Sequence, residues 1–107
     1  MSAVMEISDK SVVDAVTSSI CLESPMIKLS PSCPMGVSNA AIYYRRTHSV
    51  TMMEIKGNCY VVVRSSSTSP TTVLQGIKKL AEQMGGRCQI LSGVEASEID
   101  VLASNVY

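Results

Sequence analysis

One stretch of the chain, Cys59–Arg87, constrains the fold more than any other, because it contains a strand, a turn, a helix start and a helix stop in that order. Its first part, CYVVVRS, has the β-branched and aromatic residues typical of a strand. Ser69 and Pro70 mark a helix start, since proline at the first helical position loses no hydrogen bond. An apolar stripe at helical spacing then runs to Gly85-Gly86, which end the helix. The chain therefore contains a strand with a helix to pack on it.

Two more strands are predicted before this unit, at 41–46 and 49–56. The dipeptide Gly57-Asn58 joins the second of them to the strand at 59–65, and such dipeptides favour two-residue hairpin turns. The three strands should form an antiparallel meander. With Gly57-Asn58 as the turn, Thr51 lies opposite Arg64.

The strand at 59–63 is apolar on both faces, which predicts that it is central in the sheet or covered by a partner. The remaining segments supply a helix at 9–20 capped by Ser8, a short edge strand at 26–29, a strand at 87–92, and a helix from about Val94 to Ser104 with Ser92 and Glu95 as a capping box. We expect an α+β sandwich: a three-strand antiparallel meander plus one or two further strands, packed by two or three helices.

The length of 107 residues suits a single domain spanning 1–107. Phe and Trp are absent, so the core must use Val, Ile, Leu, Ala and seven Met. No apolar run is long enough to span a membrane, so we expect no membrane partner. The first residues also lack the pattern of a signal peptide. We therefore expect a cytoplasmic protein, with a secreted protein as the alternative if such a peptide was removed.

Four widely spaced cysteines, Cys21, Cys33, Cys59 and Cys88, lack the close pairs of zinc modules. We expect reduced cysteines, no metal and no cofactor. Two disulfides are the alternative, and they would fit a secreted, disulfide-stapled effector or toxin.

Charge is segregated along the chain, although the net charge is zero. Residues 25–90 carry eight Lys or Arg side chains against two Glu, whereas both ends are acidic. Two interpretations stay open: the acidic ends fold over the basic middle and cancel it, or one face stays basic and attracts anions.

Two basic segments could bind an anion. The first is the turn after the third strand, where a helix N-terminus and hydroxyl groups could hold a phosphate or carboxylate. The second is YYRRTH at 43–48, where alternate strand residues pair Tyr43 with Arg45 and Tyr44 with Arg46. The rings could stack bases and the guanidinium groups could contact phosphates. Ordinary explanations are a solvated capping turn and an exposed hairpin face. The predicted ligand-binding residues are Tyr43, Tyr44, Arg45, Arg46, Arg64, Ser66, Ser67 and Ser69.

No arrangement of catalytic residues emerges, so we expect a small, non-enzymatic binding or regulatory module. Its basic central segment would bind an anionic ligand or single-stranded nucleic acid. The alternative is a protein-protein interaction module that forms homo-oligomers through strand 59–63 or an apolar helix face.

Overall fold

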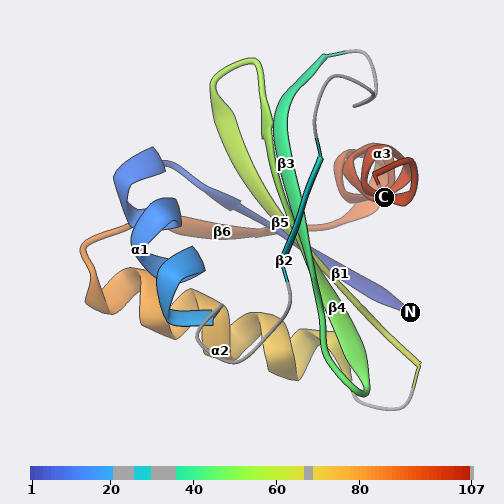
Figure 1. The fold of residues 1–107 in the computed structure, drawn as a ribbon, viewed down its shortest axis with the longest axis horizontal. Coiled ribbons are helices and arrows are strands. Elements are labelled where there is room, and N and C mark those ends of the chain that lie inside the picture. Colours follow the sequence, from blue (N-terminus) through green and yellow to red (C-terminus); the bar gives the residue numbers. More distant parts are fainter. Residues whose placement is uncertain (21–25, 30–35, 67–68, 107) are drawn as a thin grey trace.

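The computed structural model describes residues 1–20, 26–29, 36–66 and 69–106, and a six-stranded antiparallel sheet is its centre. The strand order is β2-β3-β4-β5-β1-β6 (Figure 1). The strands are β1 Ser2–Ile7, β2 Met26–Leu29, β3 Val37–Tyr44, β4 His48–Ile55, β5 Asn58–Ser65 and β6 Cys88–Leu91. The predicted meander is β3-β4-β5, and the predicted edge strand is β2.

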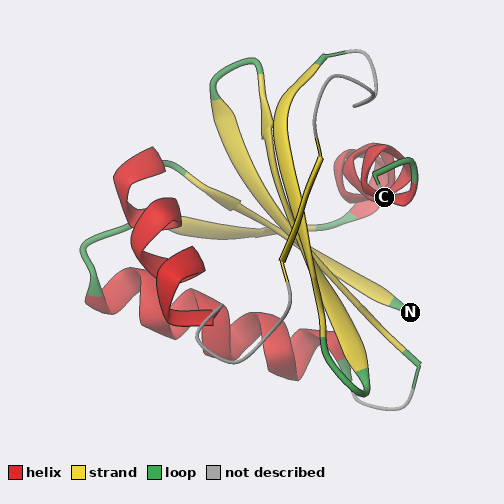
Figure 2. Cartoon of the chain, in the orientation of Figure 1, coloured by secondary structure: helices red, strands yellow, loops and turns green. Residues whose placement is uncertain are grey.

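Three helices cover the sheet on both faces (Figure 2). Helices α1 (Lys10–Ile20) and α2 (Pro70–Gln83) pack on one face, where the core contains Met5, Val61 and Leu74. Helix α3 (Gly93–Ser104) packs on the other face, where Val62 and Ile99 belong to a second core cluster. The α+β prediction is confirmed, and both predicted core faces of β5 are buried.

Strand β1 was not predicted, and it takes a central place between β5 and β6. Met5 and Ile7 are fully buried on the face that α1 and α2 cover, while Val4 is buried on the α3 face. Three strands therefore extend the meander, where the sequence predicted one or two. With β1 on one side and β4 on the other, β5 has both edges paired. Strand 59–63 thus has no free edge for a second copy, contrary to the route of self-association that the sequence suggested.

The hairpin between β4 and β5 turns at Lys56-Gly57, so the prediction of Gly57-Asn58 was wrong. Lys56 and Gly57 have φ of 50° and 83°, and Ile55 pairs with Asn58. Positive φ at both central residues is the requirement of the turn that matches the twist of a hairpin. Pairing therefore shifts by two residues, which keeps every side chain on its predicted face and places Arg64 opposite Ser49.

The three predicted helix caps differ in the structure. At α2, Ser69 is the N-cap residue but makes no side-chain capping hydrogen bond. Asp9 caps α1, because its Oδ1 accepts a hydrogen bond from the Ser11 amide at 2.9 Å, while the Ser8 amide donates to the Arg87 carbonyl at 3.0 Å. The hydrogen bond from the Ser11 hydroxyl and, to a smaller extent, the one from the Ser11 amide hold the pKa of Asp9 below its usual range. At α3, Ser92 is the N-cap residue but makes no side-chain capping hydrogen bond, so the predicted capping box is absent.

The helices of the described segments are too short or too polar to cross a membrane. The helix stop at Gly85 is confirmed, with φ of 90°. Gly86 follows it in close contact with α1, since a Cβ there would lie 2.7 Å from Val12 Cγ1. This contact fixes how the end of α2 meets α1.

Candidate functional site

A row of polar side chains crosses four strands on the face that α3 covers. Tyr44 pairs with Ser49, Ser49 with Arg64, and Arg64 with Ser2. Paired residues of antiparallel strands share a face, so the four side chains are neighbours. The adjacent row, which runs from Ile42 through Thr51 and Val62 to Val4, is buried, and Thr51 is its one polar residue. The polar row therefore lies at the margin of the core and not within it.

Arg64 in this row binds Asp100 of α3. Its Nη2 donates to the Asp100 carboxylate at 2.9 Å and to the Asp100 carbonyl at 2.6 Å, and its Nε donates to the carboxylate at 3.2 Å. Both side chains are about one-third exposed. The basic middle of the chain is thus partly neutralised by the acidic C-terminal segment, and Arg64 is held in one orientation.

A pocket of about 670 Å³ opens above this row. It brings together four of the predicted site residues, Tyr44, Arg46, Arg64 and Ser66, which come from β3, the β3–β4 turn, β5 and the residue after β5. Its lining also includes Met1, Ser2, Thr47, His48, Ser49, Ser65 and Asp100. We call this the hairpin pocket.

The β3–β4 turn gives the hairpin pocket its shape and part of its polarity. The Arg45 amide donates to the His48 carbonyl at 2.8 Å, and the Ser65 hydroxyl donates to the Thr47 carbonyl at 3.1 Å. The first bond closes the turn, and the second attaches it to β5. Burial and, to a smaller extent, the positive charge of Arg45 hold the pKa of His48 below its usual value. His48 is therefore neutral at pH 7.

Arg46 is exposed, and it makes no hydrogen bond or ion pair with any of the residues that the structure describes. Tyr44 has an exposed fraction of 46%, so much of its ring surface is open to solvent. Tyr44 and Arg46 thus both line the pocket, but Arg46 lies in the β3–β4 turn, because β3 ends at Tyr44 and not at Arg46 as the predicted strand at 41–46 did.

The other predicted site residues lie elsewhere. Tyr43 is buried in the core against α1 and α2, with 1% of its surface exposed, and does not line the pocket. Neither Arg45 nor Ser69 is among the lining residues, and Ser69 is the residue before α2. Ser67 lies outside the described residues.

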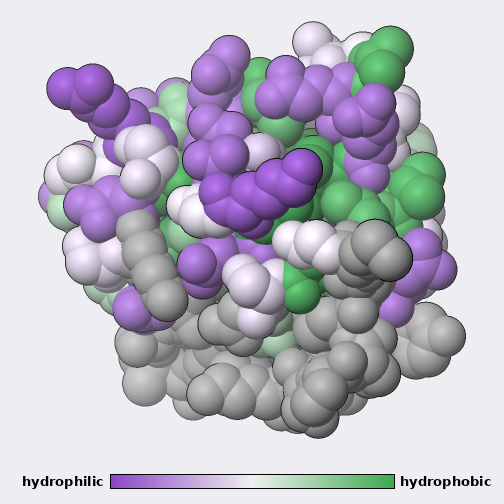
Figure 3. Space-filling model, turned by 90° about the horizontal axis from the view of Figure 1, so that it is seen from above, coloured by the Kyte–Doolittle hydropathy of each residue, from purple (hydrophilic) through white to green (hydrophobic). Residues whose placement is uncertain are grey.

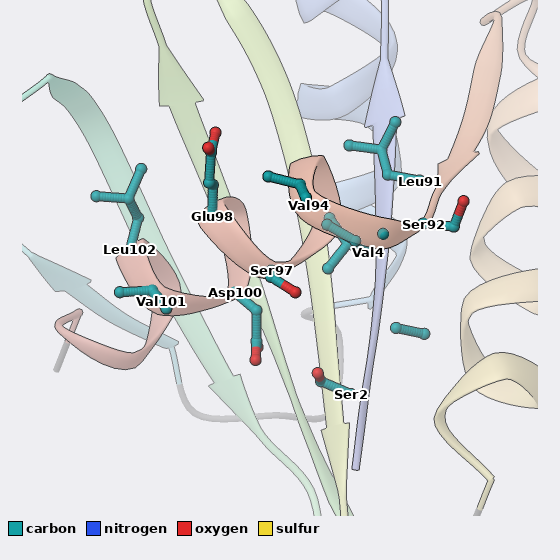
Figure 4. A pocket seen from close by; sticks show the side chains of 13 residues that line it. Ser2, Val4, Leu91, Ser92, Val94, Ser97, Glu98, Asp100, Val101 and Leu102 are labelled. Atoms are coloured by element: carbon teal, nitrogen blue, oxygen red, sulfur yellow. The ribbon is translucent and has the colours of Figure 1, made fainter.

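A second hollow, of about 1010 Å³, lies along α3 and is mostly apolar (Figure 4). It shares Ser2 and Asp100 with the hairpin pocket, and Asp100 points from α3 toward Ser2. Val94 and Val101 line this hollow and are 76% and 60% exposed. Hydrophobic residues also gather on the side of the molecule nearest α3 in Figure 3. The Arg64–Asp100 ion pair thus stands between a polar and an apolar hollow.

Within the described segments, no three or more His, Cys, Asp or Glu side chains are grouped so that they could hold a metal ion. Cys59 is buried and Cys88 is partly buried, and both are free thiols. Burial, with a further contribution from Glu82, raises the pKa of Cys88. Cys21 and Cys33 lie outside the described residues.

The predicted site residues do not include seven residues that line the pocket: Met1, Ser2, Thr47, His48, Ser49, Ser65 and Asp100. Thr47 and His48 belong to the segment 43–48 that the sequence singled out. Ser49 carries no local signal, because its place depends on the hairpin register. Asp100 is distant in sequence, and the only available signal was the excess of acidic residues in the C-terminal segment.

Comparison with known proteins adds no further assignment: no protein family, curated protein or solved structure matches the chain at a significant level.

Proposed function

We propose that the protein is a small, non-enzymatic binding module that takes a phosphate-bearing ligand in the hairpin pocket. The observation that carries this proposal is the meeting of two guanidinium groups, Arg46 and Arg64, with the half-exposed ring of Tyr44 in one hollow. The strands and turns that contribute these residues belong to one hydrogen-bonded sheet, so the groups are arranged before a ligand arrives.

The two arginines have different roles in this proposal. Arg46, which has no ion-pair partner among the described residues, contributes a charge-assisted hydrogen bond to a phosphate oxygen. Arg64 is positioned by Asp100 through Nε and Nη2, which leaves Nη1 outside the ion pair and able to donate to the same ligand. The hydroxyls of Thr47 and Ser66 line the pocket and can donate further hydrogen bonds.

Tyr44 favours a ligand that carries a planar ring beside its phosphate. Bases stack on exposed tyrosine rings, and a neighbouring arginine contacts the phosphate. A free nucleotide and a short single strand of nucleic acid present the same two groups. The pocket volume of about 670 Å³ is within the range of small-ligand sites.

Isothermal titration calorimetry tests the proposal with three ligands: inorganic phosphate, a mononucleotide and a single-stranded oligonucleotide, each at low and high salt. We expect binding that weakens with salt, since exposed charges are screened. Tighter binding of the mononucleotide than of phosphate would support stacking on Tyr44. Tighter binding of the oligonucleotide than of the mononucleotide would identify nucleic acid as the source.

The matched variants are Arg46→Gln and Lys79→Gln, which remove the same charge from the pocket and from exposed α2. Loss of one charge-assisted hydrogen bond should weaken binding about tenfold in Arg46→Gln. Lys79→Gln should bind as the wild type does. Equal affinities of the two variants, or no salt-sensitive binding of any ligand at low ionic strength, would overturn the proposal.

A further inference from the structure

The sheet has two edge strands, β2 and β6. A charged residue or a proline on an edge strand discourages pairing with another chain. The β6 edge, CQIL, carries neither a charged residue nor a proline. The sequence of β6 therefore leaves this edge open to a further strand.

The backbone groups that β6 directs outward follow from its pairing with β1. The Ser8 amide donates to the Arg87 carbonyl in the same register that pairs Ile7 with Cys88. Antiparallel pairing alternates, so residues 87, 89 and 91 direct their amide and carbonyl groups toward β1. Cys88 and Ile90 direct theirs away from the sheet, where no described residue pairs with them.

Exposed apolar side chains flank this edge on both faces. Ile90 is 37% exposed on the face of α1 and α2. Val94, in the first turn of α3 on the opposite face, is 76% exposed. An added strand would cover surface on both sides of the sheet, which a lone β6 leaves in water.

We propose that β6 pairs antiparallel with β6 of a second copy, about a twofold axis at Gln89. Residues that lie opposite each other in an antiparallel pair share a face of the sheet, and side chains alternate between the faces along each strand. In a twofold pair of identical strands, an odd-numbered residue must therefore lie opposite an odd-numbered one, and an even-numbered residue opposite an even-numbered one. The register centred on Gln89 places Cys88 opposite Ile90 of the second copy, and Ile90 opposite its Cys88. All four outward groups of each strand are then paired, whereas a register centred on Cys88 or Ile90 pairs only half of them within the strand.

Charge complementarity favours a second copy over an unrelated chain. In this register Arg87 lies opposite Leu91 of the second copy, just before that copy's α3. Helix α3 carries Glu95 in its first turn, and Arg87 is exposed on the same face of the sheet. The twofold axis therefore places Arg87 of each copy beside the start of the other copy's α3, whose first turn is acidic. Since the paired strands are short, the dimer is of the weak, concentration-dependent kind.

Sedimentation velocity across a wide concentration range tests the proposal on the full chain, followed by two edge variants. Ile90→Pro removes an amide that the monomer does not use, because proline is tolerated at an edge position that faces solvent. Ile90→Lys adds the charge that β6 lacks. Both variants should stay monomeric at concentrations where the wild type dimerises, and far-ultraviolet circular dichroism checks that each is folded.

The register is tested by Gln89→Cys, with Gln83→Cys on exposed α2 as the matched control. Gln89 faces its own copy at a non-hydrogen-bonded position, where Cβ atoms are close enough for a disulfide. Under mild oxidation, two copies of the Gln89→Cys variant should form a disulfide with each other at position 89, identified by peptide mapping. The Gln83→Cys variant should form no such bond at position 83.

Arg87→Glu and Glu95→Arg should each weaken the dimer, and the double variant should restore it. A wild type that stays monomeric at every concentration would overturn the proposal and leave the edge to an extended segment of another protein. Dimers that persist in both Ile90 variants, or a Gln89→Cys variant that forms no disulfide at position 89, would also overturn it. Ligand binding is not measured in these experiments, so their failure leaves the proposed function standing.

Discussion

Arg64 of β5 and Asp100 of α3 form a double contact, in which one guanidinium binds both the carboxylate and the main-chain carbonyl of the same residue. The carbonyl contact ties the backbone of α3 to the sheet, independently of the charge on Asp100. The carboxylate contact neutralises Arg64, whereas Arg46 has no ion-pair partner among the described residues and keeps its positive charge in the hairpin pocket. Helix α3 therefore holds Arg64 in position in the proposed site and lowers the positive charge there.

Asp100→Asn should strengthen phosphate binding and weaken the fold slightly. The substitution removes a negative charge from the pocket, so we expect affinity to rise several-fold at low ionic strength. Because the ion pair is about one-third exposed, the free energy of unfolding should fall by only about 0.5–1 kcal/mol. Calorimetric titration and urea denaturation measure the two effects.

Glu98→Gln is the matched control for this substitution. It removes the same charge from α3, but Glu98 lines the apolar hollow and not the hairpin pocket. Its phosphate affinity should stay near that of the wild type. An equal gain in both variants would mean that the net charge of the helix, and not the pocket, sets the affinity.

The affinity of the hairpin pocket for inorganic sulfate should rise as the pH falls below 6.5. Burial and Arg45 lower the pKa of His48, so the imidazole is neutral in the free protein at pH 7. A bound anion favours the charged imidazole, so binding and protonation of His48 promote each other. His48→Gln should abolish the rise. Inorganic sulfate is the probe because phosphate gains a proton over the same pH range, and its loss of negative charge would oppose the effect.

The same lowered pKa predicts a loss of stability in acid. A group whose pKa is lower in the folded state than in the unfolded state binds its proton more readily when unfolded. The contribution of His48 is therefore complete above pH 6.5 and is lost as the pH falls through the folded value. Thermal denaturation of His48→Gln should show a shallower decline over this range. If the stability of His48→Gln falls with pH as steeply as that of the wild type, groups other than His48 cause the loss of stability in acid.

Two glycine-to-alanine substitutions should have opposite effects on stability. In Gly86→Ala the new Cβ would lie 2.7 Å from Val12 Cγ1, and we expect a loss of about 1–3 kcal/mol. In Gly76→Ala the new Cβ meets no atom within 4 Å, and the helix should gain about 1 kcal/mol. Urea denaturation measures the stability of both variants. When Val12→Ala is added to Gly86→Ala, the double variant should recover part of the stability that Gly86→Ala alone loses. Stabilisation by Gly86→Ala would contradict the close packing of α1 on α2.

Met5→Ala tests the central place of β1. Met5 has no exposed surface, and truncation of a buried methionine costs about 2–5 kcal/mol. Met84→Ala, at an exposed fraction of 38%, is the control and should cost far less. Similar denaturation midpoints for the two variants would show that β1 is not part of the core.

Local signals predicted the meander, α2 and the edge strand β2, because each depends on residues that are close in sequence. The exception is β1. No turn signal borders its six residues, and apolar residues are buried on both of its faces, so the sequence does not alternate between apolar and polar residues as a half-buried strand does. Its position depends on pairing with β5 and β6, which are distant in sequence.

The candidate site was harder to predict than the fold. Two hairpin registers that differ by two residues keep the same side chains on the same faces, so hydrophobicity cannot separate them. Only the observed register places Arg64 beside Ser49 and in line with Tyr44. Tyr43 and Tyr44 likewise have the same chemistry, and the sheet alone decides which of them is buried.

The central claim, that the hairpin pocket binds a phosphate-bearing ligand, is tested most directly by following backbone amide resonances while a mononucleotide is added. The account predicts shifts concentrated at Tyr44–Ser49, Arg64–Ser66 and Asp100, saturating with one site and absent in Arg46→Gln. Shifts confined to the lysines of α2, or no saturable shifts at low ionic strength, would contradict it.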